Sequence, residues 1–251
     1  ARNFYNRGFQ FLNPEIDQGV GPYLFSGEMP IAPFLMAGMY RLAGGVHEWA
    51  ARSVSVFFAM LMLIVLYCFV RRLEGETRAL VALLFAALSP LSVAFSRSIQ
   101  PDILMLFASV GGLYAFHLFL DEKKWRYYFL SSALIALAVA TKIYTLYLFI
   151  PLLAMAWLRD GRRVLLQPRN YFFALTVSLT LIWYAYVWQI GQRQTLYYSP
   201  LEYHRGVAYA NFADLFSMVN ILVFLKIFFV HVLTPLGSAF FLIGFFRKTE
   251  K

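Results

Sequence analysis

The first residues that could do chemistry lie in a short polar stretch between two long apolar runs. Residues 96–102 include Arg97 and Asp102, whereas residues 79–95 and 103–120 contain no Asp, Glu, Lys or Arg. A proline precedes Asp102 and suits the first turn of a helix, which would place this carboxylate at the positively polarised helix N-terminus. Asp102 can therefore be a catalytic or metal-binding group at the mouth of a helix bundle, or a helix cap that faces water.

Lys142 and Glu28 are the next candidates. Lys142 is the one charged residue in the apolar stretch 127–158, and Glu28 lies in a Gly-Glu-Met-Pro sequence just before a short apolar segment. An ionisable group at membrane depth is costly and usually faces an aqueous cavity. Two ordinary interpretations stay open, because a lysine can extend its ammonium group to lipid headgroups and a loop glutamate is commonly solvated.

A polar loop rich in tyrosine, residues 192–214, holds His204 and Arg205. Its tyrosines could stack on a sugar ring, or they could form an aromatic belt at a membrane interface. The chain contains no H-x-x-x-H pair and none of the glycine-rich phosphate-binding motifs, so the sequence offers no zinc or nucleotide signature.

Composition indicates which kind of structure must position these residues. The chain is 61% hydrophobic and 14% charged, with a mean hydropathy of +0.62, whereas a soluble domain carries about a quarter charged residues. The apolar runs are long enough for membrane-spanning helices and too long for barrel strands. The net charge of +9 would suggest nucleic acid in a soluble protein; here most basic residues fit loops on one membrane face, which excludes a nucleic-acid partner.

The apolar runs predict an all-α polytopic membrane protein with about seven transmembrane helices. Each run approaches the about 20 residues that a helix needs to cross a bilayer core. Residues 30–42 are apolar but too short to cross, which predicts a helix lying at the interface. We expect residues 1–45 to form an extracytoplasmic loop with this juxtamembrane helix and residues 46–251 to form the transmembrane bundle. The predicted spans lie near residues 53–70, 79–95, 103–120, 127–141, 143–158, 171–190 and 227–246.

The topology depends on how residues 127–158 are divided. As one helix they would be roughly 48 Å long, too long for an ordinary crossing. Division at Thr141–Lys142 into two short spans places four basic connections on one face, the pattern of a cytoplasmic face. Residues 1–45, Asp102 and Lys142 then share the opposite, outer face. The basic residues of the four connections are Arg71, Arg72 and Arg78; Lys123, Lys124 and Arg126; Arg159, Arg162, Arg163 and Arg169; and Arg247, Lys248 and Lys251.

Short motifs stand in a defined order along the chain, at residues 1–5, 13–17, 27–35, 40–44, 47–52, 88–92, 96–102 and 140–142. In this order and spacing the chain resembles the GT-C glycosyltransferases, in the branch of the dolichyl-phosphate-mannose protein mannosyltransferases and the lipid A aminoarabinose transferases. The resemblance implies an inverting transferase in a bacterial or archaeal plasma membrane. It would move a sugar from a polyprenyl-phosphate carrier to a protein hydroxyl, lipid or glycan on the extracytoplasmic face.

The resemblance also implies roles for individual residues. The family's general base is an Asp in an Asp-Glu pair at the end of a first span, a position that would fall a few residues before Ala1. Glu28 and Asp102 match supporting acidic positions, and the same two carboxylates could hold a divalent cation, Mg or Mn. Arg97 and Lys142 are the candidates for binding the donor phosphate, with Tyr5, His204 and Arg205 as further substrate contacts. Met29 replaces the lysine of the aminoarabinose branch, so that phosphate contact is not expected here.

Two other functional classes fit a polytopic membrane protein. A lipid-linked sugar transporter or flippase would show internal repeats with broken helices in matching halves. The sequence suggests one break, near Pro235, and no repeat is evident. A non-catalytic membrane scaffold is the third alternative, and absence of the upstream Asp-Glu pair would favour it.

Overall fold

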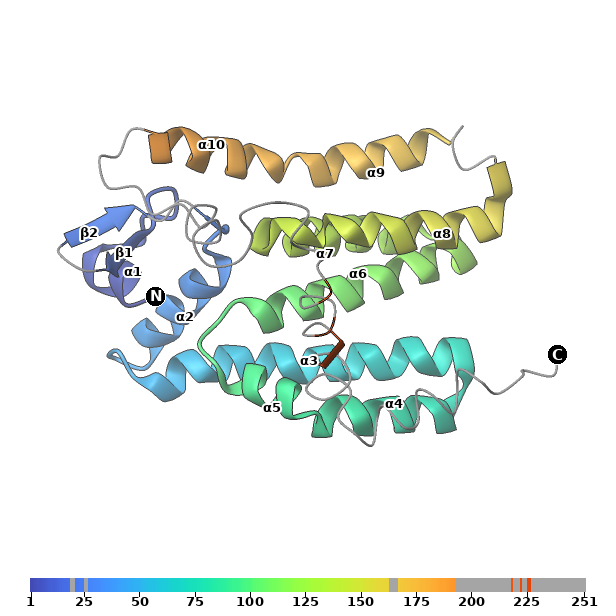
Figure 1. The fold of residues 1–251 in the computed structure, drawn as a ribbon, viewed down its shortest axis with the longest axis horizontal. Helices are drawn as coiled ribbons and strands as arrows, with labels where there is room; N and C mark the ends of the chain where they lie inside the picture. The colour runs from blue at the N-terminus through green and yellow to red at the C-terminus, as the bar shows by residue number, and fades with distance from the viewer. Residues whose placement is uncertain are drawn as a thin grey trace.

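The computed structural model describes residues 1–18, 21–24, 27–162 and 167–192, with four further positions at 218, 222, 225 and 226. It is a bundle of helices with one small β-hairpin at its N-terminal end (Figure 1). The long helices run roughly side by side, and α1, α2 and the hairpin gather at one end of the bundle.

The opening region has more regular structure than its turn-rich sequence indicates. It consists of α1 (Arg2–Arg7), strands β1 (Glu15–Gln18) and β2 (Gly21–Leu24), which pair antiparallel, and α2 (Ile31–Leu42). The predicted short apolar helix is thus confirmed as α2. One face of α2 is buried against α1 and α3 through Ala32, Met36, Ala37 and Tyr40.

Two predicted spans are confirmed as long continuous helices. Helix α3 (Glu48–Glu74) has 27 residues and α6 (Asp102–Glu122) has 21, so at about 1.5 Å per residue both can cross a bilayer core. α6 packs closely on α7 (Trp125–Thr141) through Gly111 and Gly112. A Cβ added to Gly112 would lie 2.6 Å from Cδ1 of Ile135, an example of small residues allowing close helix contact.

The predicted span near residues 79–95 is bent in the structure. The structure has α4 (Glu76–Leu88) and α5 (Pro90–Arg97), bent by 61° at the break. Pro90 lacks an N–H and its ring clashes with a preceding helical turn, so α4 ends before it and α5 begins with it. The pair is still long and apolar enough to be one broken crossing.

The division of residues 127–158 is confirmed. α7 ends at Thr141; after Lys142 a 3₁₀ segment, η1 (Ile143–Leu148), continues into α8 (Phe149–Asp160). The predicted run 171–190 is two short helices, α9 (Pro168–Ser178) and α10 (Leu181–Gln192). The predicted span 227–246 lies outside the described residues.

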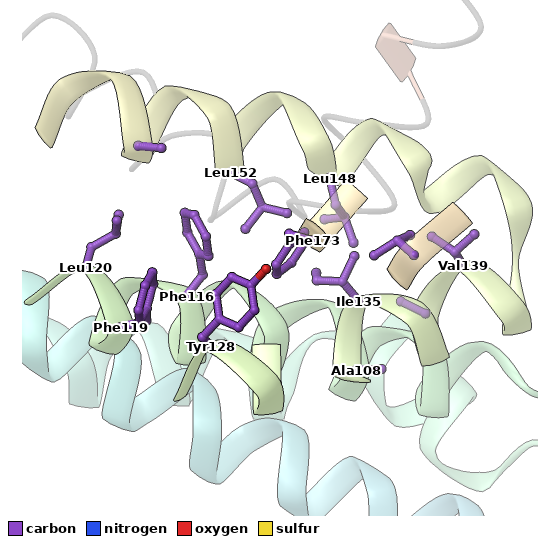
Figure 2. Close-up of a cluster of buried hydrophobic side chains, with 13 residues drawn as sticks. Ala108, Phe116, Phe119, Leu120, Tyr128, Ile135, Val139, Leu148, Leu152 and Phe173 are labelled. Carbon is purple, nitrogen blue, oxygen red and sulfur yellow. The ribbon is translucent and has the colours of Figure 1, made fainter. Parts of the chain in front are cut away.

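Within the described part of the chain, three helices are long and apolar enough to cross a membrane, or four if α4 and α5 form one span. The core between α6, α7, α8 and α9 is aromatic: Phe116, Phe119, Tyr128 and Phe173 meet in Figure 2. Their rings contact edge to face or tilted, with centroids 5.2–6.3 Å apart, which fixes the helices that carry the candidate site.

A network of charges identifies the basic end of the bundle. Asp121, near the end of α6, contacts Arg72 of α3 at 3.4 Å and Arg159 of α8 at 3.0 Å. The ends of α3, α6 and α8 therefore meet, which brings three of the four predicted basic connections to one end of the bundle. The fourth, at residues 247–251, lies outside the described residues. The start of α6 and the end of α7 lie at the opposite end, with Asp102 and Lys142.

Candidate functional site

Three of the predicted site residues meet at that opposite end. Nζ of Lys142 donates a hydrogen bond to Oε1 of Glu28 and lies 3.9 Å from Oδ1 of Asp102. The side chains are 19%, 29% and 24% exposed for Lys142, Glu28 and Asp102. They come from three separate segments, so the fold forms an acid–lysine–acid cluster that remains accessible from outside. We call these three residues the triad.

Lys142 is held at a sharp change in backbone direction. It is the C-cap of α7 with an extended backbone, φ −149° and ψ 111°. The N–H of Lys142 donates to Ala138 O at 2.9 Å. The carbonyl of Lys142 accepts hydrogen bonds from the N–H and the Oγ1 of Thr145, at 3.0 and 2.7 Å. Thr141 and Thr145 are fully buried. These hydrogen bonds and buried side chains fix the end of α7, and with it the position of the Lys142 backbone.

Glu28 is positioned by its two neighbours. The N–H of Met29 donates to Ala140 O at 3.0 Å, and Nε1 of Trp183 donates to Gly27 O at 3.1 Å. The loop that carries Glu28 is thus bound to the last turn of α7 on one side and to α10 on the other.

Tyr184, the next residue of α10, binds the same turn of α7. Its hydroxyl lies 2.7 Å from Val139 O and 3.0 Å from Ala140 O. The last carbonyls of a helix have no partner within it, so this hydroxyl supplies a donor shared by Val139 O and Ala140 O, the second of which also accepts from Met29 N–H. The sequence had indicated neither Trp183 nor Tyr184, because within an apolar run they look like ordinary membrane-facing aromatics.

Asp102 lies in the first turn of α6 and is not its cap. Pro101 occupies the N-cap position, and no side chain makes a capping hydrogen bond there. The preceding loop is fastened to α3, since Arg52 donates to Arg97 O at 2.9 Å and Ser55 donates to Ser98 O at 2.7 Å. Asp102 therefore faces Lys142 from a fixed helix terminus, which argues against the simple cap interpretation.

The electrostatics of the triad follow from two carboxylates sharing one ammonium. Burial raises the pKa of Glu28 and the charge of Asp102 adds to that rise, while the hydrogen bond and charge of Lys142 oppose it. Burial lowers the pKa of Lys142, but the hydrogen bond to Glu28 and the charges of Glu28 and Asp102 outweigh it, so the pKa is raised. Lys142 consequently stays cationic at neutral pH.

The other predicted site residues are placed differently. The side chain of Arg97 is exposed and makes no ion pair with the residues that the structure describes. Tyr5 packs edge to face on Tyr40, with centroids 6.2 Å apart, in the contact between α1 and α2. His204 and Arg205 lie outside the described residues. Substrate contacts by these four residues stay predictions.

The described residues do not form a divalent-cation site by themselves. Over this part of the chain no three His, Cys, Asp or Glu side chains come together. Glu28 and Asp102 already flank an ammonium group that would repel Mg or Mn, and these ions prefer several oxygen ligands. The predicted cation at Glu28 and Asp102 stays a prediction that needs further ligands.

The fold and the site define an integral membrane protein with a charged, accessible cluster at one end of a helical bundle. A family model described as dolichyl-phosphate-mannose-protein mannosyltransferase matches residues 27–188, and the chain belongs to this family. Comparisons with curated proteins and with solved structures gave no match. The matched region includes the triad, Trp183 and Tyr184. The resemblance to GT-C enzymes is thereby confirmed, and the family implies a membrane glycosyltransferase that uses a lipid-linked sugar donor.

Proposed function

We propose that this protein transfers a sugar from a polyprenyl-phosphate carrier to a protein, lipid or glycan acceptor, with inversion, on the extracytoplasmic face of a bacterial or archaeal plasma membrane. The observation that carries the proposal is Lys142, a cation 19% exposed at one end of the bundle. The family supplies the reaction class, and the triad supplies a group suited to the donor phosphate.

Lys142 has hydrogen-bonding capacity to spare for a ligand. An ammonium group has three donors. Glu28 takes one of them, and Asp102 at 3.9 Å is beyond hydrogen-bond distance. The remaining donors have no acceptor in the described part of the chain. Glu28 and Asp102 keep the lysine charged and in place, and a phosphate oxygen can take the remaining donors.

The proposed reaction follows from this arrangement. The acceptor oxygen bonds to the anomeric carbon as the bond from that carbon to the phosphate oxygen breaks, and the electron pair leaves with the phosphate. The donor phosphodiester thereby becomes a monoester with one more negative charge, so a fixed cation stabilises the transition state more than the ground state. The acceptor's proton goes to a carboxylate general base.

The outward orientation rests on charge. Basic residues gather at the end of the bundle around Asp121, and the triad lies at the other end. Short basic loops stay on the cytoplasmic side, which supports an extracytoplasmic triad.

The test uses the full-length protein in sealed vesicles with a polyprenyl-phosphate sugar labelled in the sugar. We expect donor in the leaflet that adjoins the triad to be cleaved, with release of polyprenyl phosphate and transfer of the label to an acceptor. Movement of intact labelled donor across the bilayer without cleavage would contradict the proposal and establish a flippase. If neither cleavage nor movement of the donor occurred with any of a panel of sugars, that result would also contradict the proposal and would favour a scaffold.

A further inference from the structure

Two consecutive residues of α10 donate hydrogen bonds to backbone carbonyls that lie one to three residues from Glu28 and Lys142 in the chain. Trp183 donates to the carbonyl of Gly27, one residue before Glu28, at 3.1 Å. Tyr184 donates to the last turn of α7, two to three residues before Lys142. Successive side chains of an α-helix diverge by about 100°, so a single turn of α10 can bind two separate segments at once.

The acceptors on α7 make this contact structurally important. Val139 and Ala140 are buried, with 0% and 4% of their surface exposed, so water has little access to their carbonyls. An unpaired buried carbonyl costs about 1–3 kcal/mol. Met29 N–H and the Tyr184 hydroxyl are the donors that the structure supplies there. The direction in which the chain leaves α7 therefore depends on the loop that carries Glu28 and on α10.

Trp183 is itself held rigidly. It is 5% exposed, and its ring lies 5.8 Å from Phe11 of the opening region and 5.8 Å from Tyr186. A buried ring in contact on two sides has few alternative rotamers. Its N–H thus gives the Gly27 carbonyl a fixed location relative to α10.

We propose that Trp183 and Tyr184 are positioning residues, which set the distance and direction of Glu28 relative to Lys142 and so keep the lysine in register with the donor phosphate. The inference rests on the function proposed above. Both residues act through the triad and neither needs to touch the substrate. Groups held by rigid neighbours bind and react better than mobile ones, and a misplacement of about 1 Å can cost as much as 100-fold in rate.

The test is a pair of double-variant cycles in the full-length protein, with binding of polyprenyl phosphate as the readout because it needs no turnover. Tyr184→Phe removes one donor and keeps the ring, and Trp183→Phe removes the indole N–H and keeps an aromatic, though smaller, ring. Each is expected to weaken binding about five- to tenfold, the range for loss of one hydrogen bond. In a Lys142→Met background neither should weaken it further, because effects that act through one group are not additive.

The control is Tyr186→Phe, which removes another hydroxyl of α10. Tyr186 is half-buried, and its hydroxyl makes an exposed 3.4 Å contact with Asn13 Oδ1. It should leave binding unchanged. In turnover assays the two test variants should raise KM as well as lower kcat. A merely structural role would reduce the amount of active protein, lowering apparent kcat at unchanged KM.

The outcomes separate this inference from the proposed function. Equal losses in the wild-type and Lys142→Met backgrounds, or no loss at all in Trp183→Phe and Tyr184→Phe, would overturn the positioning role alone. Unchanged binding in Lys142→Met itself would overturn the phosphate role of the triad, and the inference with it.

Discussion

Lys142→Met should leave Glu28 and Asp102 as two neighbouring carboxylates without a cation. At 3.9 Å and an effective dielectric constant of about 20, the attraction between Lys142 and Asp102 alone is about 4 kcal/mol. Hydration of the ion pair offsets much of this, because all three side chains are partly exposed. We therefore expect a net loss of about 1–3 kcal/mol in the free energy of unfolding.

The assay is thermal unfolding of the purified protein in detergent. For a chain of this size each kcal/mol shifts Tm by roughly 2–4 °C, so Lys142→Met should lower it by roughly 2–12 °C. Adding Glu28→Gln removes one of the two carboxylate charges and should recover at least half of the loss. Lys124→Met is the matched control, since Lys124 pairs with Glu122 at the exposed opposite end and should leave Tm unchanged.

Two results would contradict this prediction: Lys142→Met unfolding at the wild-type temperature, or a double variant less stable than the single one. Either result would mean that the carboxylates do not sense the lysine, and that the triad is not an electrostatic unit.

Three further predictions concern the same molecule. Gly112→Ala should lower Tm because its Cβ would lie 2.6 Å from Ile135, a cost of about 1–3 kcal/mol, whereas Gly38→Ala in open space should raise or maintain it. Asp121→Asn should destabilise the protein by about 1–2 kcal/mol through loss of its links to α3 and α8, with a smaller effect in high salt. The pKa of Lys142 is raised in the folded protein. Its contribution to stability is therefore fully present at any pH below the pKa of an unfolded lysine, and it is lost as pH rises through the raised pKa of the folded state. The Tm difference between wild type and Lys142→Met should hold from pH 7 to about pH 10 and shrink above that.

The sequence was sufficient to predict where the triad gathers. The excessive length of residues 127–158 and the basic loops required a break at Lys142, and the break placed this lysine at the same end as Asp102 and Glu28. These are properties of single segments and of loop charge, which local sequence encodes directly.

Contacts between distant segments could not be predicted in this way. Trp183 binds a carbonyl 156 residues away in the chain, and an apolar run gives no sign of which of its aromatic side chains does so. The hairpin β1–β2 likewise depends on pairing across a turn-rich stretch. The bend before Pro90 was missed, although the proline is visible in the sequence and its effect on a helix is local.

The most direct measurement is the initial rate of polyprenyl phosphate release from the lipid-linked sugar by the full-length protein, for wild type, Lys142→Met and Lys124→Met at matched folded fraction. Lys142→Met is expected to lower the rate about 100- to 1,000-fold, as loss of one group that stabilises developing charge does, while Lys124→Met keeps the wild-type rate. A Lys142→Met rate within about tenfold of wild type, or an equal loss in Lys124→Met, would contradict the claim that Lys142 holds the departing phosphate.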